Sequence, residues 1–209
     1  MRMGGGLPKQ FMPLAGKPIL MHTLERFHEW DAAVETTVVL PEEHEEYWRM
    51  LCREIGCKVP HRVVHGGETR FHSVFNAIQT IGGDGLVAVH DGVRPFVATD
   101  VIASCFMAAE AYGAAIPVVP VVESVREIGG GTSRPFDRNR LRIVQTPQVF
   151  RSEVLREAYG QPYNACFTDD ASVVEAAGHT IHLVDGNREN IKITTPTDLK
   201  VAALLTETT

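Results

Sequence analysis

The chain has 209 residues, of which 44% are hydrophobic and 22% are charged, and its formal net charge at pH 7 is −6. This composition is typical of a globular protein with one core, and it predicts a single domain over residues 1–209. The acidic balance and the scattered basic residues argue against a nucleic-acid-binding surface. No apolar run approaches the length of a membrane span, so we expect a cytoplasmic protein that does not enter a membrane.

The first ten residues form a basic loop that contains Gly4, Gly5 and Gly6. Glycine-rich loops that bind phosphates normally follow a strand, and no strand precedes this one in the sequence. The segment is therefore either a flexible terminus or a phosphate loop that lacks its strand.

Strands and helices alternate after this loop. Apolar periodicity, charged helix starts and β-branched runs predict a helix from Pro18, a strand at 34–40, a helix at 41–56, a strand at 61–65, a helix to about 81, a strand at 86–90, a helix to 112 capped by Thr99 or Asp100, and a strand at 114–122. Later helices are expected at 152–159, at 169–177 and from 195, with strands at 180–184 and 190–193 and a return to the core at 146–150. The alternation predicts an α/β fold, Rossmann-like, with a mostly parallel twisted sheet and helices on both faces.

The alternation stops between residues 123 and 145. Two strands, at 123–128 and 136–144, are predicted on either side of the glycine turn at 129–131. No helix follows that could cover such a hairpin, and an isolated hairpin is marginally stable. We therefore hypothesise a β-hairpin arm that forms a dimer.

The polar residues at the carboxyl end of the strand predicted at 86–90 form the first candidate site. Ligands bind at the carboxyl ends of strands in open α/β sheets. There, Asp91 is a hard oxygen ligand suited to Mg²⁺, Gly92 allows close approach, and Arg94 can bind a phosphate. An ordinary turn with a surface ion pair would use the same residue types.

A second candidate site lies where Gly66 and Gly67 join a strand to a helix. Backbone N–H groups at such a joint can bind an anion, and the Ser73 hydroxyl lies about one helical turn further on. The alternative is a tight turn in which Glu68 provides a favourable charge at the start of the helix.

The four cysteines, Cys52, Cys57, Cys105 and Cys166, have neither zinc-ligand spacing nor the pattern of a disulfide framework. We expect them to be reduced thiols of a cytosolic protein.

Six motifs occur in order along the chain: Arg2-Met3 with Pro8-Lys9-Gln10, Gly66-Gly-Glu-Thr-Arg-x-x-Ser73, His90-Asp-Gly-Val-Arg-Pro95, Thr146-Pro-Gln148, Thr168-Asp-Asp-Ala-Ser172 and Asn190-Ile-Lys192. In this order and at these separations they closely resemble the 2-C-methyl-D-erythritol 4-phosphate cytidylyltransferase family, which has a nucleoside-triphosphate-transferase fold. The resemblance covers nearly the whole chain and is specific because the motifs occur together.

The resemblance implies that methylerythritol phosphate attacks the α-phosphorus of CTP, that pyrophosphate leaves, and that CDP-methylerythritol enters the non-mevalonate isoprenoid pathway. For such a transfer the protein mainly positions the substrates and stabilises charge. The catalytic basic residues implied are Arg2, Lys9, Arg138 and Lys192. The CTP-binding residues implied are Gly67, Glu68, Arg70, Ser73, Asp91 and Gly92. The residues implied for the polyol phosphate are Arg94, Ser124, Arg138, Thr146, Thr168 and Lys192.

The resemblance also implies a cofactor and a partner subunit. Asp91 would hold Mg²⁺, with Asp185 or Glu189 as an uncertain second carboxylate. The arm would reach the site of a second copy in a homodimer, so that Arg138 acts in trans. No histidine is assigned a catalytic role, and His90 is expected to pack or to support a neighbouring residue.

The front of the chain departs from the family pattern, because the first strand and the first half of the glycine loop are absent. Losing a central strand would leave two neighbouring strands unpaired. We therefore expect the intact protein to carry about 15 more residues, as judged from strand and loop lengths.

Two other functions remain open. A cytidylyltransferase for another polyol phosphate, such as ribitol 5-phosphate, would share the nucleotide half of the site. An inactive nucleotide-binding homologue would keep the fold without the reaction.

Overall fold

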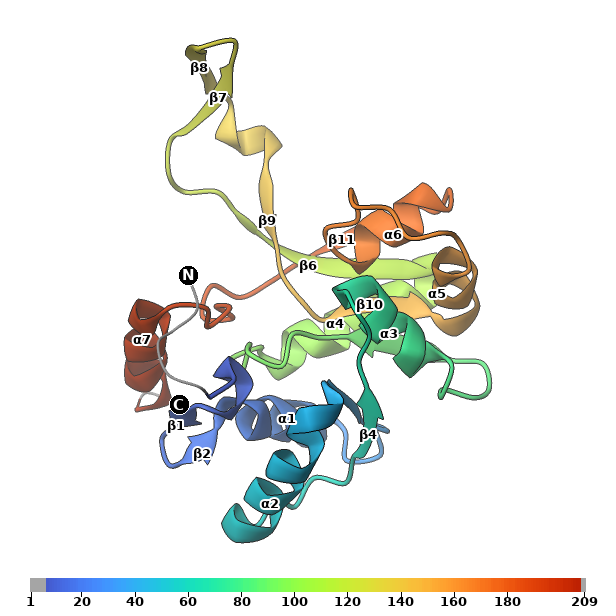
Figure 1. Cartoon of the computed structure of the whole chain (residues 1–209). Coiled ribbons are helices and arrows are strands. Elements are labelled where there is room, and N and C mark those ends of the chain that lie inside the picture. Colours follow the sequence, from blue (N-terminus) through green and yellow to red (C-terminus); the bar gives the residue numbers. More distant parts are fainter. Residues whose placement is uncertain (1–6, 208–209) are drawn as a thin grey trace.

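The computed structural model describes residues 7–207. Figure 1 shows a body of helices and sheets from which a long hairpin projects. The central sheet has the strand order β11–β6–β10–β5, with β9 paired to β6. These strands are β5 (Leu86–Val89), β6 (Ala114–Pro120), β9 (Arg142–Val144), β10 (Gln148–Arg151) and β11 (His182–Asp185). Strands β5, β6 and β11 run in one direction, and β9 and β10 in the opposite one. The predicted α/β class is confirmed, but the central sheet is mixed rather than mostly parallel: among its described strands β11 and β6 pair in parallel, and the other pairs are antiparallel.

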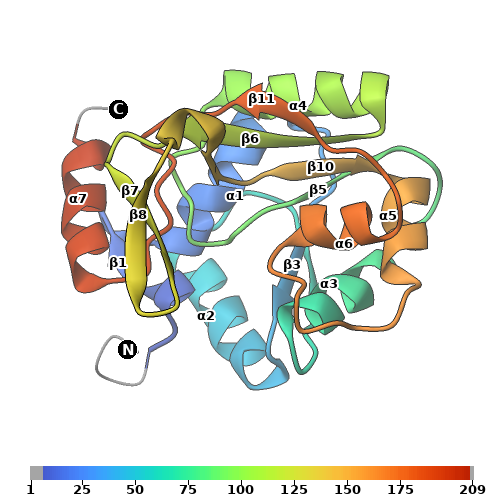
Figure 2. The same cartoon turned by 90° about the horizontal axis from the view of Figure 1, so that it is seen from above.

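Helices cover both faces of this sheet, as Figure 2 shows. The helices are α1 (Ile19–Trp30), α2 (Glu45–Ile55), α3 (Arg70–Ile78), α4 (Thr99–Tyr112), α5 (Ser152–Tyr159), α6 (Asp170–Ala176) and α7 (Pro196–Thr206). Neighbouring residues of β10 pack in opposite directions: Val149 contacts the cluster of α1 and α4, and Phe150 that of α3, α5 and α6. Both side chains are fully buried, which explains why this strand is apolar without alternation.

A second sheet contains only β3 (Thr37–Leu40) and β4 (Arg62–His65), which pair in parallel. A mostly apolar cavity of about 710 Å³ lies between β3 and β5 and is also lined by α1 and α3. Within residues 7–207, no strand pairs with the edges of β3 and β5 that border this cavity.

The hairpin arm is formed by β7 (Val125–Gly129) and β8 (Thr132–Phe136). Its turn consists of Gly130 and Gly131, whose φ angles are +56° and +76°. Two consecutive positive φ angles suit a two-residue hairpin turn, and glycine adopts them without strain. The turn therefore sets the register, and the partner strand begins immediately after it.

The predicted second arm strand, at 136–144, is wrong. After β8 the chain makes a short 3₁₀ helix, η3 (Arg138–Arg140), which Asp137 caps by accepting a hydrogen bond from Asn139. Residues 142–144 then pair with β6 in the body rather than with the arm.

Smaller differences from the prediction concern a missing strand, a helix cap and short elements that the sequence did not indicate. Residues 190–193 form no strand, because they make isolated hydrogen bonds, such as Asn190 Nδ2 to the Thr146 carbonyl and Ile193 N–H to the Val93 carbonyl, instead of a ladder with a neighbouring strand. Helix α4 begins after Ala98 and has no side-chain cap. The hairpin of β1 (Pro13–Leu14) and β2 (Lys17–Pro18) was not predicted, nor were the 3₁₀ turns η1 (Lys9–Phe11) and η2 (Glu42–His44). Across residues 7–207, no helix has the length and apolarity needed to cross a membrane.

Candidate active site

Asp91 follows β5 directly and is the centre of the candidate site. Its carboxylate accepts a hydrogen bond from Arg94 Nε at 3.0 Å and lies 3.2 and 3.3 Å from Lys192 Nζ through its two oxygens. Burial opposes ionisation of this carboxyl group, but Lys192 and Arg94 outweigh the effect and hold the pKa of Asp91 below its ordinary value. The site therefore contains an ionised carboxylate between two cations.

The loop that carries Lys192 is held in place by a buried amide. Asn190 is fully buried and donates through Nδ2 to the Thr146 carbonyl at 2.9 Å. The main-chain carbonyl of Asn190 accepts a hydrogen bond of 2.7 Å from Arg94 Nη1. Ile193, also fully buried, anchors the other side of the lysine and donates its N–H to the Val93 carbonyl. Lys192 therefore reaches Asp91 from a loop that packs on both sides of it.

A chain of hydrogen bonds behind Asp91 determines how that residue is held. The Asp91 N–H donates to the Thr146 hydroxyl at 3.1 Å, and this hydroxyl lies 3.0 Å from His90 Nδ1. The other ring nitrogen, Nε2, lies 3.0 Å from the Arg94 carbonyl and must donate to it. The Thr146 hydroxyl therefore donates to a neutral imidazole, and burial lowers the pKa of His90 to about 4, which keeps it neutral.

These hydrogen bonds give Thr146 a different role from the substrate contact expected from the sequence. The side chain is buried, and its hydroxyl is used within the protein by Asp91 and His90. Thr146 therefore supports Asp91, as does His90, which the sequence analysis expected to pack or to support a neighbour.

The glycine pair forms a closed turn before α3. The Gly67 N–H donates to the Ser73 hydroxyl at 3.1 Å, and this hydroxyl donates to the Thr69 carbonyl at 2.9 Å. A Cβ atom at Gly67 would lie 2.5 Å from the Cβ of His72, so only glycine fits without a shift. Ser73 thus shapes the turn, while the Glu68 side chain is exposed beside it.

Arg70 is held by a carboxylate that sequence reasoning did not single out. Asp170 is fully buried and accepts hydrogen bonds from the two terminal nitrogens of the Arg70 guanidinium, from Nη1 at 2.9 Å and from Nη2. The Tyr159 hydroxyl donates to the same carboxylate at 2.6 Å. Burial raises the pKa of Tyr159, and the charge of Asp170 raises it further. The Thr-Asp-Asp motif contained the signal, because its second aspartate had no assigned role.

Four of the residues predicted to bind CTP border one cavity, together with Gln10 of η1. They are Arg70, Ser73, Asp91 and Gly92. Lys9 begins the same short turn as Gln10 and makes no ion pair with any residue from 7 to 207. Arg2 lies outside the described residues.

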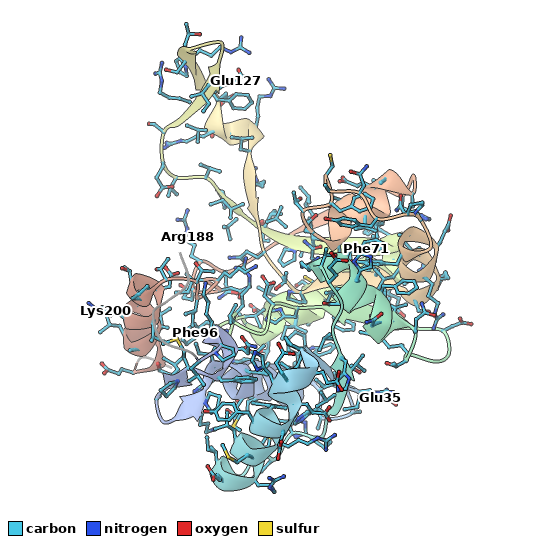
Figure 3. The ribbon with its side chains drawn as sticks, viewed as in Figure 1. Glu35, Phe71, Phe96, Glu127, Arg188 and Lys200 are labelled. Atoms are coloured by element: carbon cyan, nitrogen blue, oxygen red, sulfur yellow. The ribbon has the colours of Figure 1, made fainter. Side chains whose placement is uncertain are left out.

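The remaining predicted residues lie at the edges of the site or on the arm. Thr168 is exposed before α6, where its N–H donates to the Ser172 hydroxyl at 3.1 Å. Ser124 is exposed at the start of the arm, and Arg138 donates to the Val122 carbonyl on the same arm. Figure 3 shows Glu127 at the far end of this projection. No described contact brings Arg138 to Asp91 of its own chain.

Comparison with known proteins adds to this geometry. The model of the 2-C-methyl-D-erythritol 4-phosphate cytidylyltransferase family matches residues 1–207. The chain belongs to this family. A cytidylyltransferase of this name from Bacteroides fragilis is 54% identical over 205 residues, which cover 98% of this chain and 94% of that protein. One from Bacillus cereus is 41% identical over 204 residues, 96% of this chain and 90% of that protein.

Solved structures of cytidylyltransferases agree in fold. The crystal structure of the enzyme from Thermus thermophilus is 34% identical to this cytidylyltransferase, with a TM-score of 0.78 over 97% of this chain and 95% of that one. A 4-diphosphocytidyl-2C-methyl-D-erythritol synthase is 28% identical, with a TM-score of 0.83 over 95% and 94%.

Proposed function

We propose that the Asp91 site performs the reaction that gives the family its name. The chain is a cytidylyltransferase that uses CTP and 2-C-methyl-D-erythritol 4-phosphate and forms CDP-methylerythritol and pyrophosphate in isoprenoid synthesis. The observation that supports this placement is the meeting of Asp91, Arg94 and Lys192 at the carboxyl end of β5. The cavity beside them, lined by Arg70 and Ser73, provides room for the nucleotide.

The reaction exchanges one phosphorus–oxygen bond for another. An oxygen of the acceptor phosphate forms a bond to the α-phosphorus of CTP, and the bond from this phosphorus to the pyrophosphate oxygen breaks. The attacking oxygen is already anionic, so the protein need not remove a proton. Its task is to hold two anions in line, which requires cations on both sides.

We assign Lys192 and Arg94 to the acceptor phosphate. The Lys192 side chain is 46% exposed, and among residues 7–207 its ammonium group is tied to Asp91 alone, so it can turn toward an incoming phosphate. Arg94 is fixed through Nε by Asp91 and through Nη1 by the Asn190 carbonyl, and its Nη2 would donate to the phosphate. Thr168 and Ser124 are exposed, and their hydroxyls would bind the polyol.

We assign the nucleotide to the opposite side of Asp91. Arg70, held by Asp170, and the turn of Gly67, Glu68 and Ser73 would contact the cytidine, and Gly92 lets the nucleotide approach. Lys9 and Arg2 would bind the triphosphate and stabilise charge as pyrophosphate leaves. This charge is greatest in the transition state, so these contacts would affect turnover more than CTP affinity.

Asp91 also fits a magnesium ion in its chemistry. Proteins commonly hold Mg²⁺ at nucleotide sites by one or two carboxylates, with phosphates and water as the other ligands. In residues 7–207, no three acidic, histidine or cysteine side chains form a ready metal-binding group, so Asp91 would act with the triphosphate. When bound, Mg²⁺ would neutralise phosphate charge and polarise the phosphorus centre. Asp91 would then release Lys192 for the acceptor.

We propose that two copies pair through the arm at 123–145 and complete each other's sites. Ile128 on the arm is 82% exposed, and Ile143 and Val144 at its base are 48% and 40% exposed, which suits an interface. Arg138 would then act in the partner's site. Mixing Lys9→Ala with Arg138→Ala protein tests this idea, because mixed dimers would regain one intact site and about a quarter to a half of wild-type turnover. No recovery in subunit-exchanged, confirmed dimers would contradict action in trans.

The substrate is tested by pyrophosphate release with CTP and a panel of polyol phosphates. We expect turnover with 2-C-methyl-D-erythritol 4-phosphate and much slower turnover with ribitol 5-phosphate. Preference for ribitol 5-phosphate would support the first alternative. CTP binding without turnover on any acceptor would support the inactive homologue. Omitting Mg²⁺ should abolish release, and its return should restore it.

A further inference from the structure

Two cysteines lie at opposite ends of one hydrogen bond where α2 ends. Gly56 has a φ of +78° and reverses the chain, so that the Cys57 N–H donates to the Cys52 carbonyl at 2.9 Å. Standard bond lengths then limit the separation of their Cα atoms to about 7 Å, and bends along the path shorten it. A disulfide spans Cα atoms that are about 4.4–6.8 Å apart. The backbone therefore already holds these residues at bridging distance.

The surroundings of the pair favour oxidation at Cys57. The imidazole of His61 lies beside both thiols, with its Nε2 4.0 Å from Cys52 Sγ. Interaction with the His61 side chain lowers the pKa of Cys57, whereas burial and the nearby Cys57 raise the pKa of Cys52 to about 12. One thiol of the pair is thus suited to be the nucleophile and the other to remain protonated until it is needed.

The thiols are also accessible to a small solute. Both cysteines are partly exposed, and Cys52 lines a surface hollow together with His61, Arg49, Arg53 and Arg62. Arg49 pairs with Glu45 and Arg62 with Glu35, so Arg53 is the guanidinium of this hollow that favours a thiolate or a leaving hydroxide. By contrast, Cys105 is fully buried and its burial raises its pKa to about 12.

We propose that Cys52 and Cys57 are a redox-active pair that hydrogen peroxide converts into an intramolecular disulfide. The Cys57 thiolate attacks one peroxide oxygen, the oxygen–oxygen bond breaks, and the departing hydroxide takes a proton to become water. The Cys52 sulfur then attacks the resulting Cys57 sulfenic acid, and a second water leaves with the Cys52 proton. In total, two thiols and one peroxide give one disulfide and two waters.

The pair is connected to the turn that carries Lys9. His61 Nε2 accepts a hydrogen bond of 3.0 Å from Trp48, which is fully buried and stacks on Phe11 at a centroid distance of 5.8 Å. Phe11 ends the turn that Lys9 begins. Closing the disulfide draws the sulfurs together and away from His61, so we infer that oxidation shifts Trp48 and slows cytidylyl transfer. This second part rests on the proposed function.

The test is to treat the full chain with hydrogen peroxide and follow its intact mass and tryptic peptides. Trypsin cuts after Arg53, so a disulfide would join peptide 50–53 to peptide 54–58. We expect this joined peptide and a loss of two hydrogens in the wild type and in Cys166→Ser. Cys52→Ser should stop at a sulfenic acid on Cys57 that a dimedone probe labels, and Cys57→Ser should give neither product. Oxidation confined to Cys166, or equal labelling in Cys57→Ser, would overturn the pair.

The link to Lys9 has its own readout. Oxidation should change the tryptophan fluorescence of the wild type, with the signal absent in Trp48→Phe, and should lower kcat until a thiol reductant restores it. A complete disulfide with unchanged fluorescence and unchanged kcat would overturn the link while the pair itself would stand.

Discussion

The neutral state of His90 predicts how the stability of the protein depends on pH. In the folded state burial lowers the pKa of His90 from 6.5 to about 4, whereas in the unfolded chain the ordinary value applies. Between these values the unfolded chain binds more protons, so the free energy of unfolding falls as the pH falls. The contribution is complete above about pH 6.5. Linkage gives a loss of about 2 kcal/mol between pH 7.5 and pH 5, and about 3 kcal/mol at pH 4.

Urea denaturation at pH 7.5 and at pH 5 measures this loss. His90→Gln removes the titrating group, so the variant should be less stable at pH 7.5 but should lose about 2 kcal/mol less than the wild type on acidification. His65→Gln is the matched control. The Glu45 carboxylate raises the pKa of the exposed His65, which is opposite in sign to the shift of His90. Replacing His65 should therefore not reduce the stability that the protein loses on acidification. An equal loss in wild type and His90→Gln would refute the assignment of His90 as the buried neutral base.

Three further predictions concern the site and its supports. Asp91→Asn should lower turnover by at least about a hundredfold, because it removes the charge that would hold Mg²⁺, while the far-UV CD spectrum should show that the variant is folded. In Gly67→Ala the new Cβ would lie 2.5 Å from a side-chain atom, so this variant should bind CTP more weakly, as measured by calorimetry, and should be about 1–3 kcal/mol less stable. Gly82→Ala, where the new Cβ would meet open space, should show neither effect. Asp170→Asn should lower the free energy of unfolding, measured in urea, by about 2–4 kcal/mol, a range that allows for the partial exposure of the Arg70 guanidinium. Tyr159→Phe should lower it by only about 1 kcal/mol, because this change removes one hydrogen bond and no charge. Equal losses in this last pair would show that the ion pair adds nothing.

His90 also provides a functional test of the support behind Asp91. Its two ring nitrogens join the Thr146 hydroxyl and the Arg94 carbonyl, and both partners contact Asp91 or its loop. His90→Gln should therefore reduce kcat more than it raises the KM for CTP. Unchanged kcat in a folded variant would show that the hydrogen-bond chain does not position the carboxylate.

Local patterns in the sequence were sufficient for the order and type of most elements. The apolar runs of β5 and β6, which lack polar alternation, predict strands, and α5 was predicted at its observed bounds. The residue types of the motifs also indicated phosphate chemistry, because Asp, Arg, Lys and glycine turns have properties that do not depend on long-range contacts. The proposed roles of these residues remain predictions.

The tertiary structure decided which of these residues meet. Lys192 is bound to Asp91 across 101 positions of sequence, and Arg70 to Asp170 across 100. No local signal identifies the partner in either pairing, since a charged residue has the same local sequence whether it faces water or a partner. The segment 190–193 shows the same limit: its apolar alternation resembles a strand, but the side chain of Asn190 and the packing of Ile193 hold it as a loop. Periodicity reports which side chains are buried, and only the fold determines which backbone partners are available to them.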